Sequence, residues 1–229
     1  MDNIRTRVRI LHLDDNPSDA KLISALIEEA DDDLSASVES VLTKEAYLAA
    51  LRSCAFDLIL SDFRMPGYDG DEALKDARAI CPDIPFIMVT GELGEERAVE
   101  TLKAGATDYV LKDRMVRLVP SIKRALKDAR LERERRESDR KYRTIVETAR
   151  EGIVFAKAEG PYSFVNQRMA EMLGYSVEEI LGKSSLDFAD EEWSKSVLRG
   201  RQELQRGEFA EGEFKFRRKD GSELWTRYS

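Results

Sequence analysis

The feature that most constrains the fold is an apolar run that ends at a carboxylate and a turn. Residues 56–62 read Phe-Asp-Leu-Ile-Leu-Ser-Asp, and the turn that follows contains Pro66, Gly67 and Gly70. A continuous apolar run of strand length is typical of a strand that is buried on both faces, as in a parallel sheet. Ligands of open parallel sheets bind beyond the carboxyl ends of the strands, so Asp62 lies where chemistry is expected.

Short apolar runs alternate with helical patterns throughout the first half of the chain. We expect strands at residues 8–13, 36–41, 57–61, 84–89 and 107–111, and helices at residues 18–30, 43–51, 70–80, 95–104 and 115–143. This alternation predicts an α/β fold with a five-stranded, doubly wound parallel sheet and right-handed crossovers.

Polar side chains lie at the carboxyl ends of four of these expected strands: Asp14 and Asp15, Asp62, Thr90, and Lys112. Carboxylates that gather at one edge repel one another unless a divalent cation joins them, and Mg²⁺ prefers oxygen ligands. With Mg²⁺ bound, Asp62 can act as a nucleophile toward a phosphoryl group and form an aspartyl phosphate. Lys112 would supply a positive charge, and Thr90 a hydroxyl donor, for the phosphoryl oxygens.

Five separated features of this half form a recognisable set: Asp14-Asp15, Asp62, Met65-Pro66 with Asp69-Gly70, Thr90, and Lys112. Together they resemble the receiver domain of two-component response regulators, the CheY-like flavodoxin-like fold, over about residues 7–127. The resemblance implies that a sensor histidine kinase phosphorylates Asp62 and that the domain assists its own phosphorylation and dephosphorylation. It further implies Mg²⁺ held by Asp15, Asp62 and the backbone carbonyl of Arg64. Asp14 would assist through water.

The resemblance extends to a switch and shows two departures. Thr90 and Tyr109 match the family's switch pair, in which the aromatic ring turns inward when the threonine moves toward the phosphate. Gly91 stands where the family often has alanine, which should leave access to the phosphoryl group open. Asp113 stands where the family often has proline, so the peptide bond after Lys112 is expected to be trans.

Two charged residues near the expected site occupy positions where the family varies. Arg64 and Glu92 could pair across the site. We predict that they, together with Gly91, tune the lifetime of the phosphate.

The pattern changes after residue 142. We expect a strand pair at 152–156 and 162–166, helices at 169–173, 176–180 and 193–205, and a hairpin of residues 211–218 and 223–228 around an Asp-Gly turn. The runs at residues 142–147, 164–166, 172–176, 179–183 and 218–222 resemble, in this order, an α+β PAS sensor domain over about residues 139–229. That family closes its sheet with one more strand, so we expect an incomplete domain.

A charged helix is expected between the two halves. Leu118, Ile122, Ala125 and Ala129 form one apolar stripe, and residues 132–141 are charged except for Ser138. The charged stretch is either a solvated helix or a signalling helix that pairs with its twin in a homodimer. We therefore expect a receiver domain at residues 1–127, a helical linker at 128–141 and a PAS domain at 142–229.

Composition excludes several classes of function. The net charge of −8 and pI near 5.0 argue against general nucleic-acid binding, and no apolar run is long enough to span a membrane. Cys54 and Cys81 lack metal-ligand spacing and are expected to be reduced thiols in a cytoplasmic protein. The only histidine, His12, is expected to be a packed strand residue, so the PAS domain should hold no haem. It has no cysteine for a covalent flavin either.

These observations predict a phosphoacceptor signalling protein that passes a conformational or dimerisation signal through a helix to a PAS domain, without catalytic output of its own. One alternative is the N-terminal part of a larger receiver-PAS histidine kinase or cyclase. Another is a PAS ligand-binding sensor module under secondary phospho-control. Haloacid-dehalogenase-like phosphatases also form an aspartyl phosphate, but they require Asp-x-Asp, which Asp62-Phe63-Arg64 does not supply.

Overall fold

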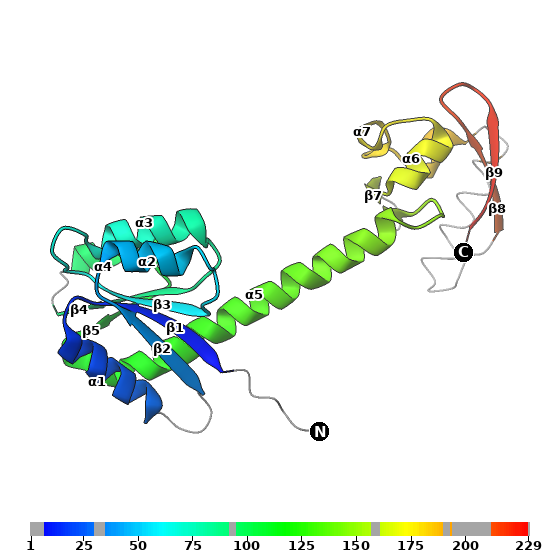
Figure 1. Ribbon diagram of the computed structural model, residues 1–229. Helices are drawn as coiled ribbons and strands as arrows, with labels where there is room; N and C mark the ends of the chain where they lie inside the picture. Colours follow the sequence, from blue (N-terminus) through cyan, green and yellow to red (C-terminus); the bar gives the residue numbers. More distant parts are fainter. Residues whose placement is uncertain are drawn as a thin grey trace, which may run out of the picture. The chain divides into compact units, whose positions relative to one another are not determined.

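The computed structural model describes residues 7–29, 35–91, 95–156, 161–189, 193 and 212–228. The chain divides into two compact units, Met1–Arg135 and Arg136–Ser229 (Figure 1). Within the described ranges, no helix is long and apolar enough to cross a membrane.

The first unit is built on one parallel sheet. Its strands are β1 (Val8–Leu13), β2 (Ala36–Val41), β3 (Leu58–Asp62), β4 (Phe86–Thr90) and β5 (Asp108–Leu111). Their order is β2-β1-β3-β4-β5, and all neighbours are parallel. The direction of winding reverses between β1 and β3, which makes the carboxyl ends of these two strands the expected place for a ligand. The predicted doubly wound five-stranded sheet is confirmed.

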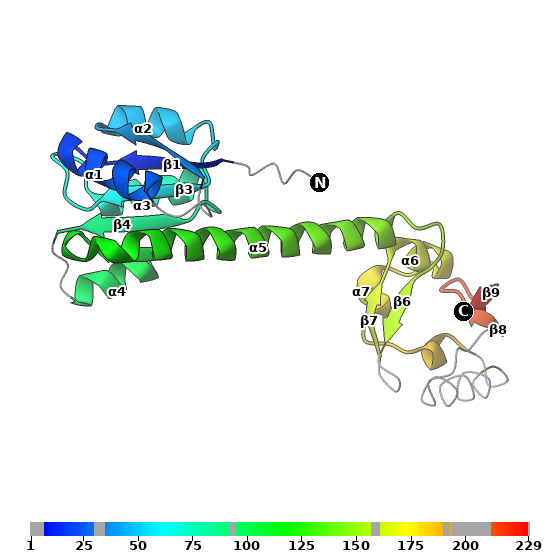
Figure 2. The ribbon, with the colours of Figure 1, turned by 90° about the horizontal axis from the view of Figure 1, so that it is seen from below.

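Helices cover both faces of this sheet. They are α1 (Pro17–Glu28), α2 (Lys44–Leu51), α3 (Gly70–Ile80), α4 (Glu95–Lys103) and the first turns of α5 (Leu118–Glu147). One apolar cluster packs α2 and α3 against one face of the sheet, and a second packs α1 and α5 against the opposite face (Figure 1). Figure 2 shows this unit from the side of α1 and α5. Strands β3 and β4 are buried at every position, which explains their continuous apolar sequence.

Strand β3 begins one residue later than expected and β4 two residues later. Both strands also end one residue later than expected, on the site residues Asp62 and Thr90. Pro85 precedes β4 and has no N–H to donate to the sheet, so the ladder begins at Phe86. The last helix likewise begins at Leu118, because Lys112–Arg117 forms a 3₁₀ segment.

The two cysteines form a disulfide, so the expectation of reduced thiols is wrong. Cys54 follows α2 and Cys81 caps α3, and their Cα atoms are 6.0 Å apart. The residues are 27 positions apart in sequence, and only the packing of α2 and α3 on the same face of the sheet brings them together.

Helix α5 is continuous over 30 residues, but only its first turns are buried. Its buried side chains are Leu118, Ser121, Ile122 and Ala125. Farther along, Arg130 pairs with Glu134 at 2.7 Å and Arg135 pairs with Glu132 at 3.0 Å. These exposed pairs at helical spacing are typical of a helix that faces solvent.

The second unit contains two antiparallel strand pairs around one apolar cluster. Its elements are β6 (Val154–Ala156), β7 (Tyr162–Val165), α6 (Gln167–Leu173), α7 (Val177–Ile180), a 3₁₀ turn at Ser185–Phe188, β8 (Gly212–Arg217) and β9 (Glu223–Tyr228). The predicted strand pair and hairpin are both present. Apart from Trp193, the helix predicted at residues 193–205 lies outside the described residues.

Candidate functional site

Three carboxylates converge at the carboxyl edge of the parallel sheet. Oxygen atoms of Asp14, Asp15 and Asp62 lie within 4.8 Å of one another. Asp14 and Asp62 are buried, whereas Asp15 is exposed. Strands β1 and β3 are parallel neighbours, and each delivers its acidic residue at its carboxyl end. The sequence-based prediction that these carboxylates meet is confirmed.

Backbone N–H groups fix one oxygen of each buried carboxylate. Asp14 Oδ1 accepts a hydrogen bond from Asn16 N at 2.8 Å, and Asp62 Oδ1 accepts one from Phe63 N at 2.7 Å. Asn16 in turn caps α1 by accepting from Ser18 N at 3.0 Å. The second oxygen of Asp14 and of Asp62 is thereby directed toward another partner.

That partner is Lys112, which lies just after β5. Its Nζ atom donates to Asp62 Oδ2 at 3.0 Å and to Asp14 Oδ2 at 3.2 Å. It also donates to Asp19 Oδ2 at 2.6 Å, a contact that the sequence analysis missed. Burial acts to lower the pKa of Lys112, but the hydrogen bonds to Asp19 and Asp62 outweigh it and raise the pKa. The ammonium group therefore stays charged at physiological pH.

Burial shifts the pKa of two residues near Lys112, Asp14 and His12. It raises the pKa of Asp14, although the Asn16 N–H and Lys112 act in the opposite direction. Burial, together with the charge of Lys112, lowers the pKa of His12 to about 4. His12 is fully buried, as predicted, and its ring nitrogens have no hydrogen-bond partner among the described residues. A neutral His12 adds no positive charge beside Asp14, so Lys112 is the cation that is hydrogen-bonded to this carboxylate.

The residues of the predicted switch lie on adjacent strands. Thr90 ends β4 and is buried, and it lies beside Leu111, the residue before Lys112. Tyr109 is half-buried on β5 and packs against the apolar cluster on the α2–α3 face. A Cβ atom added to Gly91 would meet nothing within 4 Å, so the space beside Thr90 is open.

The remaining predicted residues have different outcomes. Arg64 is exposed, and Glu92 lies outside the described residues, so their expected pairing stays a prediction. All peptide bonds of the described chain are trans, including the bond after Lys112, as expected. Arg97, which the sequence analysis did not select, pairs with Asp71 at 3.3 Å, and its guanidinium carbon lies 5.1 Å from the centroid of the Phe63 ring.

The turn after Asp62 is held by the residues of the Asp-Gly motif. Asp69 caps α3 by accepting from Glu72 N at 2.9 Å, and Gly70 N donates to Phe63 O at 2.9 Å. A Cβ atom on Gly70 would lie 2.5 Å from Met88 Sδ and 3.0 Å from Asp62 O. A side chain at residue 70 would therefore press on Met88 and on the Asp62 carbonyl, which favours glycine where α3 starts this close to the site.

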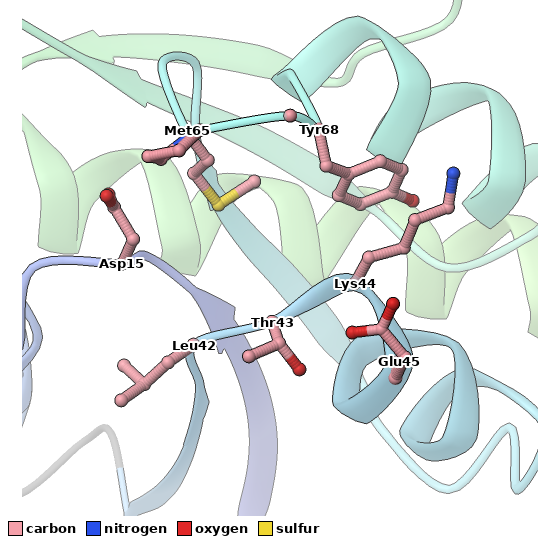
Figure 3. Close-up of a pocket in the computed structure, with 9 residues that line it drawn as sticks. Asp15, Leu42, Thr43, Lys44, Glu45, Met65 and Tyr68 are labelled. Carbon is pink, nitrogen blue, oxygen red and sulfur yellow. The ribbon is translucent and has the colours of Figure 1, made fainter.

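A shallow pocket of about 300 Å³ adjoins Asp15. It is lined by Asp15, residues 42–45 before and at the start of α2, and residues 65–68 of the turn after β3 (Figure 3). Lys44 Nζ lies 4.5 Å from the centroid of the Tyr68 ring, and the Tyr68 hydroxyl donates to Asp76 Oδ2 at 2.7 Å. The exposed carboxylate of Asp15 thus faces an open, polar approach.

The acidic cluster fits a hard divalent cation. Three carboxylates with oxygen atoms within 4.8 Å offer only oxygen ligands, which Mg²⁺ and Ca²⁺ prefer over nitrogen or sulfur. Lys112 provides the only positive charge hydrogen-bonded to them in the described part of the chain. Such an arrangement can bind a cation and an anionic phosphoryl group at one edge of the sheet.

Family models match both halves of the chain. Residues 10–123 match the response regulator receiver domain, and residues 140–228 match the PAS fold. The transcriptional regulatory protein ZraR of Salmonella typhimurium (strain LT2) is 38% identical over 109 residues, which are 48% of this chain and 24% of ZraR. The C4-dicarboxylate transport transcriptional regulatory protein DctD of Rhizobium meliloti (strain 1021) is 36% identical over 118 residues, 51% of this chain and 25% of DctD. The chain spans about a quarter of these relatives.

Solved structures give the same assignment for the first unit. The CheY-like receiver domain protein of Methanospirillum hungatei JF-1 is 30% identical, with a TM-score of 0.50, and the match covers 56% of this chain and 99% of that one. The signal receiver domain of a putative LuxO repressor protein from Vibrio parahaemolyticus is 26% identical, with a TM-score of 0.50. That match covers 56% of this chain and 95% of that one. This chain therefore belongs to the response regulator receiver family, and a PAS domain follows its receiver domain.

Proposed function

We propose that this chain is a phosphoacceptor of a two-component system and that a sensor histidine kinase phosphorylates it on Asp62. The observation that carries the proposal is the position of Lys112, within 3.0 Å of Asp62 Oδ2 and 3.2 Å of Asp14 Oδ2. A carboxylate beside an ammonium group and two more carboxylates can act as a nucleophile toward phosphorus while a cation occupies the same edge.

The transfer is a displacement at phosphorus. A carboxylate oxygen of Asp62 forms the new O–P bond while the N–P bond of a phosphohistidine breaks, and the electron pair of that bond returns to the imidazole nitrogen. Lys112 donates to a phosphoryl oxygen and offsets its charge. Thr90, at the end of the neighbouring strand β4, supplies the hydroxyl donor once the phosphoryl group is in place.

Asp14, Asp15, Asp62 and the backbone carbonyl of Arg64 would hold Mg²⁺. When bound, Mg²⁺ supplies positive charge next to the phosphoryl oxygens. Arg64, Gly91 and Glu92 lie close in sequence to Asp62 or Thr90, and we propose that they tune the lifetime of the phosphate. The open space beside Gly91 supports access of water to that position.

The signal would leave the receiver through its last helix. We propose a receiver domain at residues 1–127, a helical linker at 128–141 and a PAS domain at 142–229. Thr90 and Tyr109 would shift the receiver between two states, and phosphorylation would favour one of them. Support comes from α5, which is continuous from Leu118, in the core of the first unit, to Glu147. A homodimer through the linker, the receiver or the PAS domain would read out the shift.

Phosphorylation of the intact chain by a small phosphodonor tests the site. The protein is incubated with phosphoramidate and Mg²⁺, and its intact mass is followed. We expect one phosphoryl group to be added to the wild-type chain and none to Asp62→Asn. Asp57→Asn is the matched control, because Asp57 lies near the start of the same strand and accepts only from Arg9 N at 2.8 Å among the described contacts. Equal phosphorylation of Asp62→Asn would refute the proposal.

Molar mass in solution tests the readout. Light scattering is measured with Mg²⁺ alone and with Mg²⁺ plus beryllofluoride, which mimics the phosphoryl group on Asp62. We expect a rise toward twice the chain mass of 26.1 kDa, and no rise in Asp62→Asn. A constant dimer would mean that the signal is a rearrangement within the pair. A constant monomer would contradict the homodimer.

A further inference from the structure

Asp19 approaches the Lys112 ammonium more closely than Asp14 or Asp62 does. The Nζ–oxygen distances are 2.6 Å to Asp19, 3.0 Å to Asp62 and 3.2 Å to Asp14. Asp19 lies in the first turn of α1, whose start is fixed by the cap at Asn16 and by a proline at the first helical position. Asp14 thus belongs to the acidic cluster and also contacts Lys112, whereas Asp19 contacts Lys112 from the first turn of α1 and lies outside the cluster.

The ammonium group of a lysine needs hydrogen-bond partners to fix its position, because it lies at the end of a flexible four-carbon stem. The ammonium group has three N–H donors, and here each has a carboxylate partner: Asp14, Asp19 and Asp62. A phosphoryl group on Asp62 would offer new acceptor oxygens at the position of only one of the three. The other two donors can stay on Asp14 and Asp19 while the third turns to the phosphoryl oxygen.

We propose that Asp19 is a positioning residue for phosphoryl transfer, which holds the Lys112 ammonium so that one donor faces the incoming phosphoryl group. This inference rests on the proposed phosphorylation of Asp62. Among the described contacts, Asp19 is hydrogen-bonded to Lys112 and lies outside the acidic cluster, so it would act through Lys112. The side chains of both residues are partly shielded from water, with exposed fractions of 31% for Asp19 and 24% for Lys112.

Two other roles for Asp19 make different predictions. An acidic residue in the first turn of a helix also stabilises the helix through its dipole, which affects stability and not the rate of transfer. An extra negative charge near the site could instead repel an anionic phosphodonor, in which case its removal would accelerate the reaction and lower the donor KM. A role in holding Lys112 predicts a lower maximal rate.

The test measures the rate of phosphorylation of the full chain over a range of phosphoramidate concentrations, with Mg²⁺ present. We expect Asp19→Ala to lower the maximal rate roughly tenfold, with the donor KM changed less than about twofold, because misplacement of a charged group affects the transition state more than donor binding. Asp19→Glu keeps the charge and should restore most of the rate. Asp71→Ala is the matched control, since Asp71 is also an acid in the first turn of a helix with an exposed ion pair, to Arg97.

The double variant with Lys112→Ala decides between a role through Lys112 and a direct effect. Without Lys112, we expect Asp19→Ala to have almost no further effect on the rate. A tenfold loss that persists without Lys112, a wild-type rate in Asp19→Ala, or a faster rate would each overturn the positioning role. If the wild-type chain is not phosphorylated, or Asp62→Asn still is, the proposed function itself fails. The two failures are therefore distinguishable.

Discussion

Each of the two units of the chain contains a polar centre, and the centres differ in burial and in charge balance. In the first unit, one ammonium group, Lys112, is hydrogen-bonded to three carboxylates. In the second unit, Asn166 is neutral and fully buried, and its side chain makes four hydrogen bonds. It donates to Val146 O at 2.9 Å and Glu151 O at 3.0 Å, and it accepts from Ile153 N at 2.8 Å and Met169 N at 3.0 Å.

This difference separates a functional centre from an architectural one. The amide of Asn166 has two donors and an oxygen that accepts twice, so its capacity is fully used inside the protein. It joins the last turn of α5 to the start of β6 and to the cap of α6. The carboxylates near Lys112 carry more negative charge than one lysine offsets. A cation that binds from outside would balance this excess, as in the magnesium site proposed above.

Removal of the Lys112 ammonium should have the largest effect, on the rate of phosphorylation, and it tests whether the Lys112 centre is functional and not architectural. We expect Lys112→Ala to slow phosphorylation of Asp62 by about a hundredfold, because a charged donor aimed at the reacting group is lost. The rate with phosphoramidate and Mg²⁺ is the measurement. Lys75→Ala, which removes an exposed lysine of α3, is the matched control and should leave the rate unchanged. A Lys112→Ala rate within twofold of the wild type would show that the ammonium is only structural.

Protonation of His12 should have the next largest effect, which is on the free energy of unfolding and not on the rate of phosphorylation. Burial lowers its pKa from 6.5 to about 4, so the folded protein resists protonation of this ring. The unfolded chain binds a proton that the folded chain excludes, so the stability is full above pH 6.5 and is lost as the pH falls toward 4. The expected loss is about 3 kcal/mol over this window.

The measurement is urea unfolding of the Mg²⁺-free chain at several pH values, followed by far-UV circular dichroism. His12→Leu should remove this part of the pH dependence and leave the part that comes from the carboxylates. Among these, Asp14 acts in the opposite direction, because its raised pKa makes the folded state bind a proton more readily as the pH falls. An unchanged difference between pH 7 and pH 5 in His12→Leu would contradict the burial of a neutral ring.

Most of the charged centre could be predicted from the sequence, because all of its residues except Asp19 lie at the carboxyl end of an apolar strand. The carboxyl ends of parallel strands share one edge of the sheet, so Asp14, Asp62, Thr90 and Lys112 could be placed together without knowledge of any contact. Asp19 could not, because it lies on a helix, and an acidic residue near a helix start is common for reasons of stability. Its contact depends on how α1 lies over the edge, which periodicity does not specify.

The disulfide and the neutral centre were missed for a related reason. Cys54 and Cys81 follow two different helices, and composition favours thiols unless the packing of those helices is known. Asn166 precedes an amphipathic helix, where asparagine is an ordinary cap. Its bonds to Val146 and Glu151 depend on where α5 ends, which the sequence pattern does not specify.

Replacement of Asn166 should have the smallest of these effects and should be confined to the second unit. Asn166→Ala removes the side-chain partner of the Val146 and Glu151 carbonyl groups and of the Ile153 N–H, whereas Met169 N keeps its hydrogen bond to the backbone carbonyl of residue 166. We expect a loss of about 2 kcal/mol in the free energy of unfolding. The only tryptophans, Trp193 and Trp225, both lie in the second unit, so their fluorescence during urea unfolding reports on that unit. Ser163→Ala, which removes one exposed hydrogen bond to Phe155 O, is the control.

Phosphorylation of Asp62 should be unchanged in both variants. A slower phosphorylation in Asn166→Ala would mean that the neutral centre is not merely architectural, because the end of α5 would then influence the site at its other end.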